Sequence, residues 1–320
     1  MTTKIAYFDC FSGAAGNMLL GALLDAGYSL ESLRAGLATL GIDGYDLVQR
    51  SVQQHGITGT LFDVIDRAGE RPVRNLPLIR SILEHAKLPD GVAQKSLQVF
   101  TRLGEAEARI HGMGLDEVHF HEVGAIDTLV DIVGFCLALD EMGIEELYAS
   151  PLPLGSGTVR TEHGLLPVPA PATLALIAEV GVPTVPLDSG SEMVTPTGAA
   201  LLTTLATFER PAMRIQSVGY GFGSKEFPWA NMVRVWVGEA SPASGRRVPQ
   251  AMQHTDHTGP HDHAHPHVHP HAHPHEHPHE HPHEHPHGHD HPHATGHEHP
   301  HSHAHEDESG TGEGSVGKHI

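Results

Sequence analysis

The sequence predicts a mixed globular domain of the α/β or α+β class, followed by a disordered histidine-rich tail. Helix-like and strand-like hydrophobic patterns mix throughout the first 239 residues, which is typical of these two classes. Beyond residue 240 the composition shifts to Ser, Pro, Gly and Arg, and residues 251–320 then hold 25 of the 31 histidines. Such a segment cannot offset its loss of conformational entropy by burying apolar surface. We therefore expect a folded domain over residues 1–239 and a disordered metal-binding tail over residues 240–320.

The first predicted elements form a strand–turn–helix unit. The apolar run KIAYFD (4–9) predicts a strand, CFSGAAGN a glycine-rich turn, and MLLGALLDAG (18–27) a helix. A second helix is expected over residues 29–40. The runs YDLVQRSV (45–52) and TGTLFDVID (58–66) predict a pair of strands, which the five residues QQHGI separate.

The middle of the chain predicts three helices and one irregular stretch. The helices are LPLIRSILEHA (76–86), the long amphipathic GVAQKSLQVFTRLGEAEARIHG (91–112), and AIDTLVDIVGFCLALDEMG (125–143). Residues 147–171 are rich in Pro and Gly and are predicted to be irregular or strand-like.

The last predicted elements are two helices, a short strand and a closing hairpin. The helices cover residues 172–181 and 196–208, and the strand lies between them at residues 183–188. The hairpin joins residues 213–224 to residues 231–238. The order of these elements does not specify the topology of the sheet.

Charge and cysteine content exclude several classes of protein. The chain has 39 Asp and Glu against 19 Lys and Arg, a formal net charge of −20. A chain of this charge without a Lys/Arg stripe is a poor partner for nucleic acid or an anionic membrane, so we expect neither. Two cysteines, Cys10 and Cys136, are too few for a disulfide scaffold and fit a reducing compartment.

The sequence also predicts a soluble, cytoplasmic protein. Asp9 falls where a signal peptide would be apolar. The uncharged run MVTPTGAALLTTLATF contains a proline and has 16 residues. A bilayer crossing needs about 20 apolar residues, so this run is too short.

Alternating His-x-His sequence in the tail predicts metal binding. Neutral imidazole is a ligand for nickel, zinc, copper and cobalt, and a flexible chain imposes no fixed geometry on the ion. We therefore expect several exchanging ions, which protons displace near an imidazole pKa of about 6.5. The candidate tail ligands are His263, His265, His267, His269, His271, His273, His275, His277, His279, His281, His283, His285, His287, His289, His291 and His293.

The segment VHFHEVGAIDTLVD predicts a second, more ordered metal or acid–base site. If VHFH is extended, His119 and His121 point to one face, because side chains alternate along a strand. Glu122 follows directly, and Asp127 shares a helix face with Asp131, four residues later. Imidazoles with adjacent carboxylates are suitable ligands for a borderline metal and suitable proton acceptors. The alternative is that one histidine is a hydrogen-bonded core residue and the aspartates are solvated.

Two glycine-rich turns are candidate phosphate sites. The turn after Asp9 leads into a helix, where backbone N–H groups and the helix dipole favour an anion. The turn EMVTPTGAAL repeats this pattern, although a simple helix cap also explains it. The candidate binding residues are Ser12, Gly13, Gly16, Asn17, Thr195, Thr197 and Gly198. His163 lies in a Pro-rich stretch, where a single histidine is weak evidence for a site.

Five blocks of the chain, in this order and spacing, resemble the nickel-insertion proteins of nickel-pincer cofactor biosynthesis, the LarC family. The blocks are YFDCFSGAAGNMLLGALLDAG, VHFHEVGAIDTLVDIVG, LPVPAPAT, MVTPTGAALL and VGYGFGS. The resemblance covers residues 4–239, and the histidine-rich segment that follows is also similar to family members.

This resemblance implies a nickel chelatase or cyclometallase of the lyase class. The substrate would be pyridinium-3,5-bisthiocarboxylic acid mononucleotide, and CTP would be consumed with Mg or Mn present. The product would be the nickel-pincer cofactor, and an apo lactate racemase-type enzyme would be the downstream partner. On this interpretation His119, His121 and Glu122 transfer nickel, while Asp127 or Asp9 acts as ligand or proton acceptor. The tail would raise the local concentration of nickel.

The chain departs from the family pattern at two places. Family members continue into a second folded half, which the resemblance implies binds CTP, whereas this sequence stops at SVGKHI. We expect that half to be encoded separately, to be lost through an interrupted reading frame, or to be absent from an N-terminal fragment. Asn17 stands where the resemblance leads us to expect Asp, and the amide removes a charge.

Two other functions are consistent with these residues. One is a non-enzymatic nickel storage protein or metallochaperone, in which the folded body docks to a partner. The other is a metal-dependent phosphohydrolase that uses Asp9, His119, His121 and Asp127.

Overall fold

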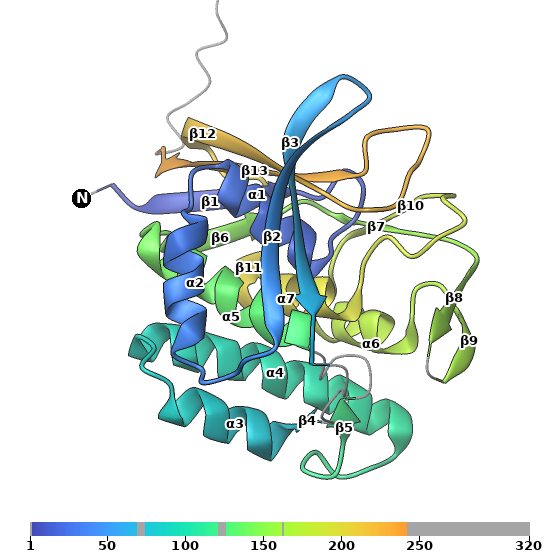
Figure 1. Ribbon diagram of the computed structural model, residues 1–320. Coiled ribbons are helices and arrows are strands. Elements are labelled where there is room, and N and C mark those ends of the chain that lie inside the picture. Colours follow the sequence, from blue (N-terminus) through green and yellow to red (C-terminus); the bar gives the residue numbers. More distant parts are fainter. Residues whose placement is uncertain (1, 69–73, 121–125, 162, 242–320) are drawn as a thin grey trace, which may run out of the picture. The chain divides into compact units, whose positions relative to one another are not determined.

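The computed structural model describes residues 2–68, 74–120, 126–161 and 163–241, apart from the side chains of His119 and Phe120. These residues form a mixed body in which helices cover a seven-stranded sheet (Figure 1). The predicted fold class is therefore confirmed. Residues 242–320 of the predicted tail lie outside the described residues.

Each predicted helix is present, and its ends differ from the prediction by at most three residues. The helices are Gly16–Asp25 (α1), Leu30–Ala38 (α2), Leu76–His85 (α3), Asp90–His111 (α4), Ile126–Glu141 (α5), Pro171–Val180 (α6) and Pro196–Leu205 (α7). The strands of the large sheet are Lys4–Asp9 (β1), Tyr45–Gln54 (β2), Ile57–Asp66 (β3), Glu146–Ala149 (β6), Ala206–Thr207 (β11), Met213–Phe222 (β12) and Met232–Ala240 (β13). The shorter strands are Arg74–Asn75 (β4), His119–Phe120 (β5), Leu152–Leu154 (β7), Thr158–Thr161 (β8), Gly164–Pro167 (β9) and Thr184–Pro186 (β10).

The large sheet is mixed, with strand order β11-β6-β1-β13-β12-β3-β2. Strand β1 pairs in parallel with β6 on one side and antiparallel with β13 on the other. Strand β12 pairs antiparallel with β13 and in parallel with β3. The N-terminal strand therefore lies between two segments that are both distant from it in the sequence.

Helices α1, α5 and α7 lie between the sheet and α4 (Figure 1). Helix α1 contacts β12 and β3 as well as α5, and α4 contacts both α5 and α7. The apolar sequence of α5 reflects this position, because a helix that is apolar on all sides is buried on all sides. The rings of Phe8 on β1 and Phe135 on α5 meet at 5.6 Å between their centroids.

The β2–β3 hairpin has a tighter turn than the sequence predicts. Only His55 and Gly56 separate the two strands, and both have positive φ, +49° and +80°. Two central residues of positive φ match the right-handed twist of paired strands, so the ladder continues to the turn. The five residues QQHGI are therefore mostly strand, and the prediction of a longer connection was wrong.

The hydrophobic core of the described residues lies within the folded body. Every residue of the two buried apolar clusters falls between Ala6 and Val237. Residues Met1–Met252 form one compact unit, separate from Gln253–Ile320. Strand β13 ends at Ala240, close to the boundary proposed at residue 239, which remains a prediction.

We expect deletion of residues 253–320 to leave the melting temperature of the body within about 2 °C of the full chain. The residues of the two described apolar clusters all remain in the shortened chain, so we expect the free energy of unfolding to change little. Thermal melts of both chains in the presence of a metal chelator would test this. A markedly lower melting temperature for the shorter chain would mean that the tail packs on the body.

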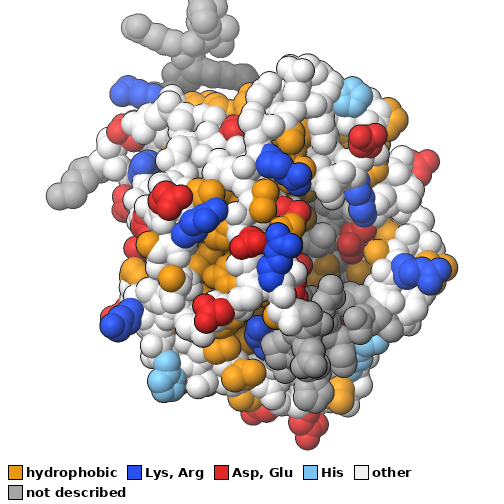
Figure 2. Space-filling model, in the orientation of Figure 1, with side chains coloured by type: hydrophobic (Ala, Val, Ile, Leu, Met, Phe, Trp, Pro, Cys, Tyr) orange, Lys and Arg blue, Asp and Glu red, His pale blue; other side chains and the backbone are white. Residues whose placement is uncertain are grey.

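No helix in the described part of the chain is long and apolar enough to cross a membrane. On the face drawn in Figure 2, the Lys and Arg side chains of the described residues are scattered among Asp and Glu side chains. This distribution differs from the continuous basic surface that typically binds a phosphate backbone.

Candidate functional site

Two glycine-rich segments, far apart in the sequence, lie side by side where helices α1 and α7 begin. Ala14 and Val194 form a parallel bridge. The Ala14 N–H donates to the Met193 carbonyl over 2.9 Å, and the Thr195 N–H donates to the Ala14 carbonyl over 3.0 Å. The Thr195 hydroxyl also accepts from the Gly198 N–H and so caps α7. The Ala14–Val194 bridge therefore places two helix N-termini next to each other.

Glycine is required at two positions of this bridge. A Cβ at Gly13 would lie 1.8 Å from the Met193 carbonyl oxygen, and Gly13 also has a φ of +98°. A Cβ at Gly198 would lie 2.2 Å from the Ala14 carbonyl oxygen. Both colliding atoms are backbone, which cannot rotate away as a side chain can. Gly13 and Gly198 thus permit the close approach of the two segments.

A cavity of about 310 Å³ lies where the N-terminal ends of α1, α5 and α7 meet β3. We call it the acidic pocket, because five carboxylates line it. They are Asp63, Glu107, Asp127, Asp131 and Glu192. The described lining residues include no Lys or Arg. Carboxylates attract a cation, while the N-terminal ends of helices favour an anion, so one ligand carrying both kinds of charge would suit this pocket.

Asp131 is the buried carboxylate of the acidic pocket, with 7% of its surface exposed. Burial raises the pKa of its carboxyl well above the usual range, and the charges of Asp127 and Asp63 raise this pKa further. A hydrogen bond from the Asn17 backbone N–H lowers the pKa of this carboxyl and so partly opposes the increase. The Oδ1 atom of Asp131 makes no hydrogen bond in the described part of the chain. A bound cation would satisfy this oxygen and neutralise the repulsion.

A second cavity of about 190 Å³, the Lys225 pocket, adjoins the acidic pocket. The two cavities share the lining residues Ala15, Asn17, Glu192 and Thr195. The Lys225 ammonium donates to the Ser191 hydroxyl over 2.8 Å. The Trp229 indole N–H donates to Ser12 Oγ over 2.9 Å, and the Ser12 hydroxyl donates to Asn231 Oδ1 over 3.3 Å. The Lys225 pocket thus combines a cationic group with ordered polar groups beside a carboxylate-lined space.

The structure brings together many of the binding residues that the sequence predicts. Gly16, Asn17, Thr195 and Thr197 line the acidic pocket together with Asp127. Ser12 lines the Lys225 pocket. Gly13 and Gly198 belong to the Ala14–Val194 bridge beside both cavities.

Asp9 lies apart from this group. Its carboxylate forms an ion pair with Arg234, which is directly opposite it on β13, and the Arg234 Nε–H donates to Asp9 Oδ2 over 3.1 Å. Asp9 lines neither the acidic pocket nor the Lys225 pocket. Its predicted role as ligand or proton acceptor stays a prediction.

The predicted histidine ligands are not placed by the structure. His119 belongs to β5, whose backbone pairs with β4, and its side chain is not described. His121, Glu122 and the tail histidines from His263 to His293 lie outside the described residues. Within the described part of the chain, no three His, Cys, Asp or Glu side chains are already arranged as the ligands of one metal ion.

Sequence reasoning missed Asp63, Glu107, Glu192 and Lys225. Asp63 lies in the middle of β3 and Glu107 in the long helix α4, where a charged residue usually indicates a solvated face. Asp131 shares a helix face with Asp127 in the sequence, and the apolar residues on both sides of it in α5 are the signal for a buried carboxylate.

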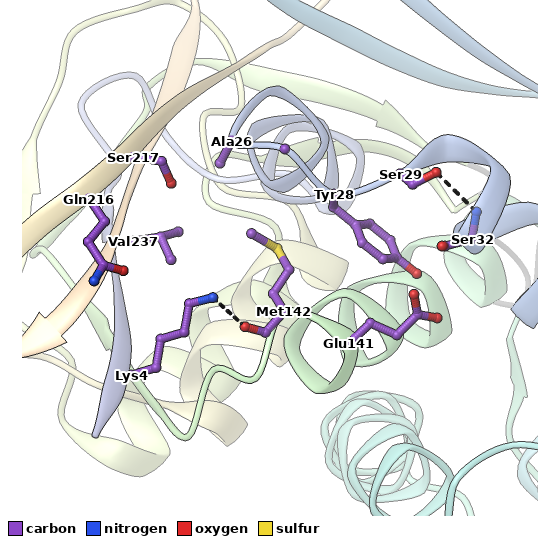
Figure 3. A pocket seen from close by; sticks show the side chains of 11 residues that line it. Lys4, Ala26, Tyr28, Ser29, Ser32, Glu141, Met142, Gln216, Ser217 and Val237 are labelled. Atoms are coloured by element: carbon purple, nitrogen blue, oxygen red, sulfur yellow. Dashed lines mark hydrogen bonds between the residues drawn. The ribbon is translucent and has the colours of Figure 1, made fainter. Parts of the chain in front are cut away.

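A larger cavity of about 420 Å³ lies at the other end of α1 (Figure 3). Lys4, Tyr28, Glu141 and Gln216 line it, and the Lys4 ammonium donates to the Met142 carbonyl over 2.6 Å. Figure 3 shows the Tyr28 ring directed toward the Glu141 side chain. This cavity lacks the group of carboxylates found in the acidic pocket, so its size does not make it the better candidate.

A comparison with known proteins shows to which family the chain belongs. The family model described as nickel insertion protein matches residues 6–267. The chain belongs to the nickel insertion protein family. The matched region includes every residue of the acidic pocket and the Lys225 pocket.

Members of the nickel insertion protein family from several bacteria are similar to this chain. A protein from Thermomicrobium roseum named for nickel insertion is 52% identical over 244 residues, covering 76% of this chain and 60% of that protein. One from Roseiflexus castenholzii, also named for nickel insertion, is 50% identical over 236 residues, covering 74% and 60%. The pyridinium-3,5-bisthiocarboxylic acid mononucleotide nickel insertion protein of Desulfitobacterium hafniense (strain DSM 10664 / DCB-2) is 48% identical over 238 residues, covering 74% and 58%.

The matched part of the chain thus spans about 60% of the length of these relatives. No solved structure matches it.

Proposed function

We propose that this chain inserts nickel into pyridinium-3,5-bisthiocarboxylic acid mononucleotide, and that the acidic pocket and the Lys225 pocket are where this takes place. The observation that carries the proposal is the junction of the two cavities, which share Asn17, Glu192 and Thr195. One cavity has carboxylates and the other an ammonium group. A mononucleotide with a cationic ring and an anionic phosphate presents the same two kinds of charge.

The charges suggest how the substrate would lie. The phosphate would approach Lys225 and the N-terminal ends of α1 and α7, where backbone N–H groups favour an anion. The pyridinium ring and the incoming nickel ion would lie on the acidic side, toward Asp127 and Asp131. The rings of Phe227 and Trp229 stack at 5.2 Å beside the Lys225 pocket and would limit the space around the ligand.

Carboxylates have two functions in this scheme. Their combined charge raises the local concentration of a divalent cation. A carboxylate next to the bound substrate would also accept the proton that leaves when a carbon–metal bond forms. Asp127 is exposed at the start of α5 and is our candidate for contact with nickel, together with His119, His121 and Glu122.

The finer parts of the proposal follow from the family resemblance. We infer a nickel chelatase of the lyase class that consumes CTP with Mg or Mn, with the nucleotide bound by a C-terminal half of the protein. The product would serve an apo lactate racemase-type enzyme. The two cysteines are free and buried, in agreement with a reducing cytoplasmic location. The histidine tail would bind nickel on the same chain as the acidic pocket and so raise its effective concentration.

Replacing Asp127 tests this assignment directly. We expect Asp127→Asn to lower the rate of nickel insertion by about 10- to 100-fold, because the amide removes a charged oxygen ligand. Asp140→Asn is the matched control, since Asp140 is an exposed carboxylate on the same helix. The assay would follow the nickel-bound product by mass spectrometry, with the full chain, nickel, CTP, Mg²⁺, the mononucleotide and the C-terminal half of a relative.

Other outcomes of this assay would favour the alternative function. Equal rates for Asp127→Asn and Asp140→Asn would contradict the assignment of Asp127. If the double change His119→Ala and His121→Ala also has no effect, while deletion of residues 253–320 abolishes nickel delivery, the chain is a metallochaperone. A phosphohydrolase is not favoured, because Arg234 already pairs with Asp9.

A further inference from the structure

Two histidines that the sequence analysis did not group come together beside the acidic pocket. His111 lies in the last turn of α4, and His163 lies in the turn between β8 and β9. Their ring centroids are 4.7 Å apart, and the ring planes are inclined at 48°. The two residues are far apart in the sequence, so the tertiary fold brings the rings together.

This separation suits two imidazoles that share one metal ion. With metal–nitrogen bonds of about 2.1 Å, two rings bound at right angles would have their centroids about 4.5 Å apart. Nickel(II) in nitrogen and oxygen sites favours square-planar or tetragonal geometry, which has such right angles. The observed separation of 4.7 Å between the ring centroids is close to this distance.

Glu107 connects the histidine pair to the acidic pocket. Its Oε2 atom lies 3.5 Å from His111 Nε2, one helical turn away on α4, and the same side chain lines the acidic pocket. His163 is exposed, the His111 side chain is 26% exposed, and the Glu107 side chain is 16% exposed. Accessibility thus decreases from His163 through His111 to Glu107.

We propose that His111 and His163 form a nickel entry site, which takes up Ni²⁺ from outside and passes it by way of Glu107 to the acidic pocket. The identity of the ion rests on the proposed function. An ion bound by these two imidazoles and otherwise by water would be held more loosely than in a closed site with three or four protein ligands. A loosely held ion can be released, which an entry site requires and a storage site does not.

Residue-resolved chemical labelling can test this entry site in the full chain. Diethyl pyrocarbonate modifies imidazoles that no metal ion occupies, and mass spectrometry reads each histidine separately, so the tail does not obscure the result. With Ni²⁺ in excess over all 31 histidines, we expect labelling of both His111 and His163 to fall about tenfold. His85 is the internal control, because it is an exposed histidine outside the pair, next to Ser81 on α3.

The variants His163→Ala and His85→Ala separate a shared ion from independent binding. His163→Ala should remove most of the nickel protection of His111, whereas His85→Ala should leave it unchanged. Protection of His111 that persists in His163→Ala, or no protection of either residue, would overturn the proposal and leave an aromatic contact only. Labelling requires neither the mononucleotide nor CTP, so this result is independent of whether the chain inserts nickel.

Discussion

Asp131→Asn should stabilise the body at neutral pH and abolish nickel insertion at the same time. In the folded chain, burial and the charges of Asp127 and Asp63 raise the pKa of the Asp131 carboxyl. The folded state therefore holds a proton that the unfolded state releases above about pH 4. Stability is lost as the pH rises from that value through the raised pKa, and an amide avoids this loss.

The stabilising effect of Asp131→Asn should depend on pH. At pH 7 without metal we expect the free energy of unfolding to rise by about 1 kcal/mol. Below about pH 4 the carboxyl is protonated in both states, so the difference from the parent chain should disappear. Urea titrations at the two pH values, with Asp140→Asn as control, would measure this difference in the free energy of unfolding. A variant that is less stable at pH 7 would show that the Asp131 charge supports the fold.

The loss of insertion in Asp131→Asn would have a separate cause. A cation in the acidic pocket would neutralise the buried carboxylate, so the parent chain gains more from nickel than the amide variant does. We expect added Ni²⁺ to raise the melting temperature of the tail-deleted parent clearly and that of tail-deleted Asp131→Asn much less. Equal shifts would place nickel elsewhere and would remove Asp131 from the proposed site.

Gly13→Ala should damage both the fold and the site. A methyl group there would lie 1.8 Å from the Met193 carbonyl oxygen, so the Ala14–Val194 bridge would have to open. We expect a loss of about 3 kcal/mol in the free energy of unfolding, from backbone strain at positive φ together with the steric clash. Binding of the mononucleotide should be lost as well, because the N-termini of α1 and α7 would move apart.

Gly27→Ala is the matched control for Gly13→Ala. Gly27 also has positive φ, +114°, but nothing lies within 4 Å of its Cβ position. Gly27→Ala should therefore lower the free energy of unfolding only by the backbone strain of about 1–2 kcal/mol. Binding of the mononucleotide should be unchanged. Urea unfolding and a calorimetric titration with the mononucleotide would compare the two. Equal losses would show that the close contact with Met193 is unimportant.

Local patterns in the sequence predicted the helices well, whereas the sheet could not be predicted. Hydrophobic periodicity and caps are local, so α1 to α7 were all found. Pairing of β1 with both β6 and β13 depends on contacts between distant segments. For the same reason the sequence could not show the ion pair of Asp9 with Arg234, because it depends on the register of β13.

The candidate site was predicted in part. Glycine-rich turns before helices led to Gly16, Asn17, Thr195 and Thr197, which share the acidic pocket. The sequence could not indicate that Glu107 faces this pocket, because α4 carries several charged residues and its periodicity does not say which neighbour each one faces. His111 and His163 each stood alone in the sequence, and only the tertiary fold brings their rings together.

The Ala14–Val194 bridge also has a consequence for the order in which the protein becomes functional during synthesis. One half of the bridge leaves the ribosome early, but its partner follows only after about 180 further residues, and Lys225 later still. A nascent chain therefore has no complete pocket until nearly all of the folded body has been made. The histidine tail is translated after that, so the segment that we propose gathers nickel appears only when the pocket that we propose receives it can already have formed.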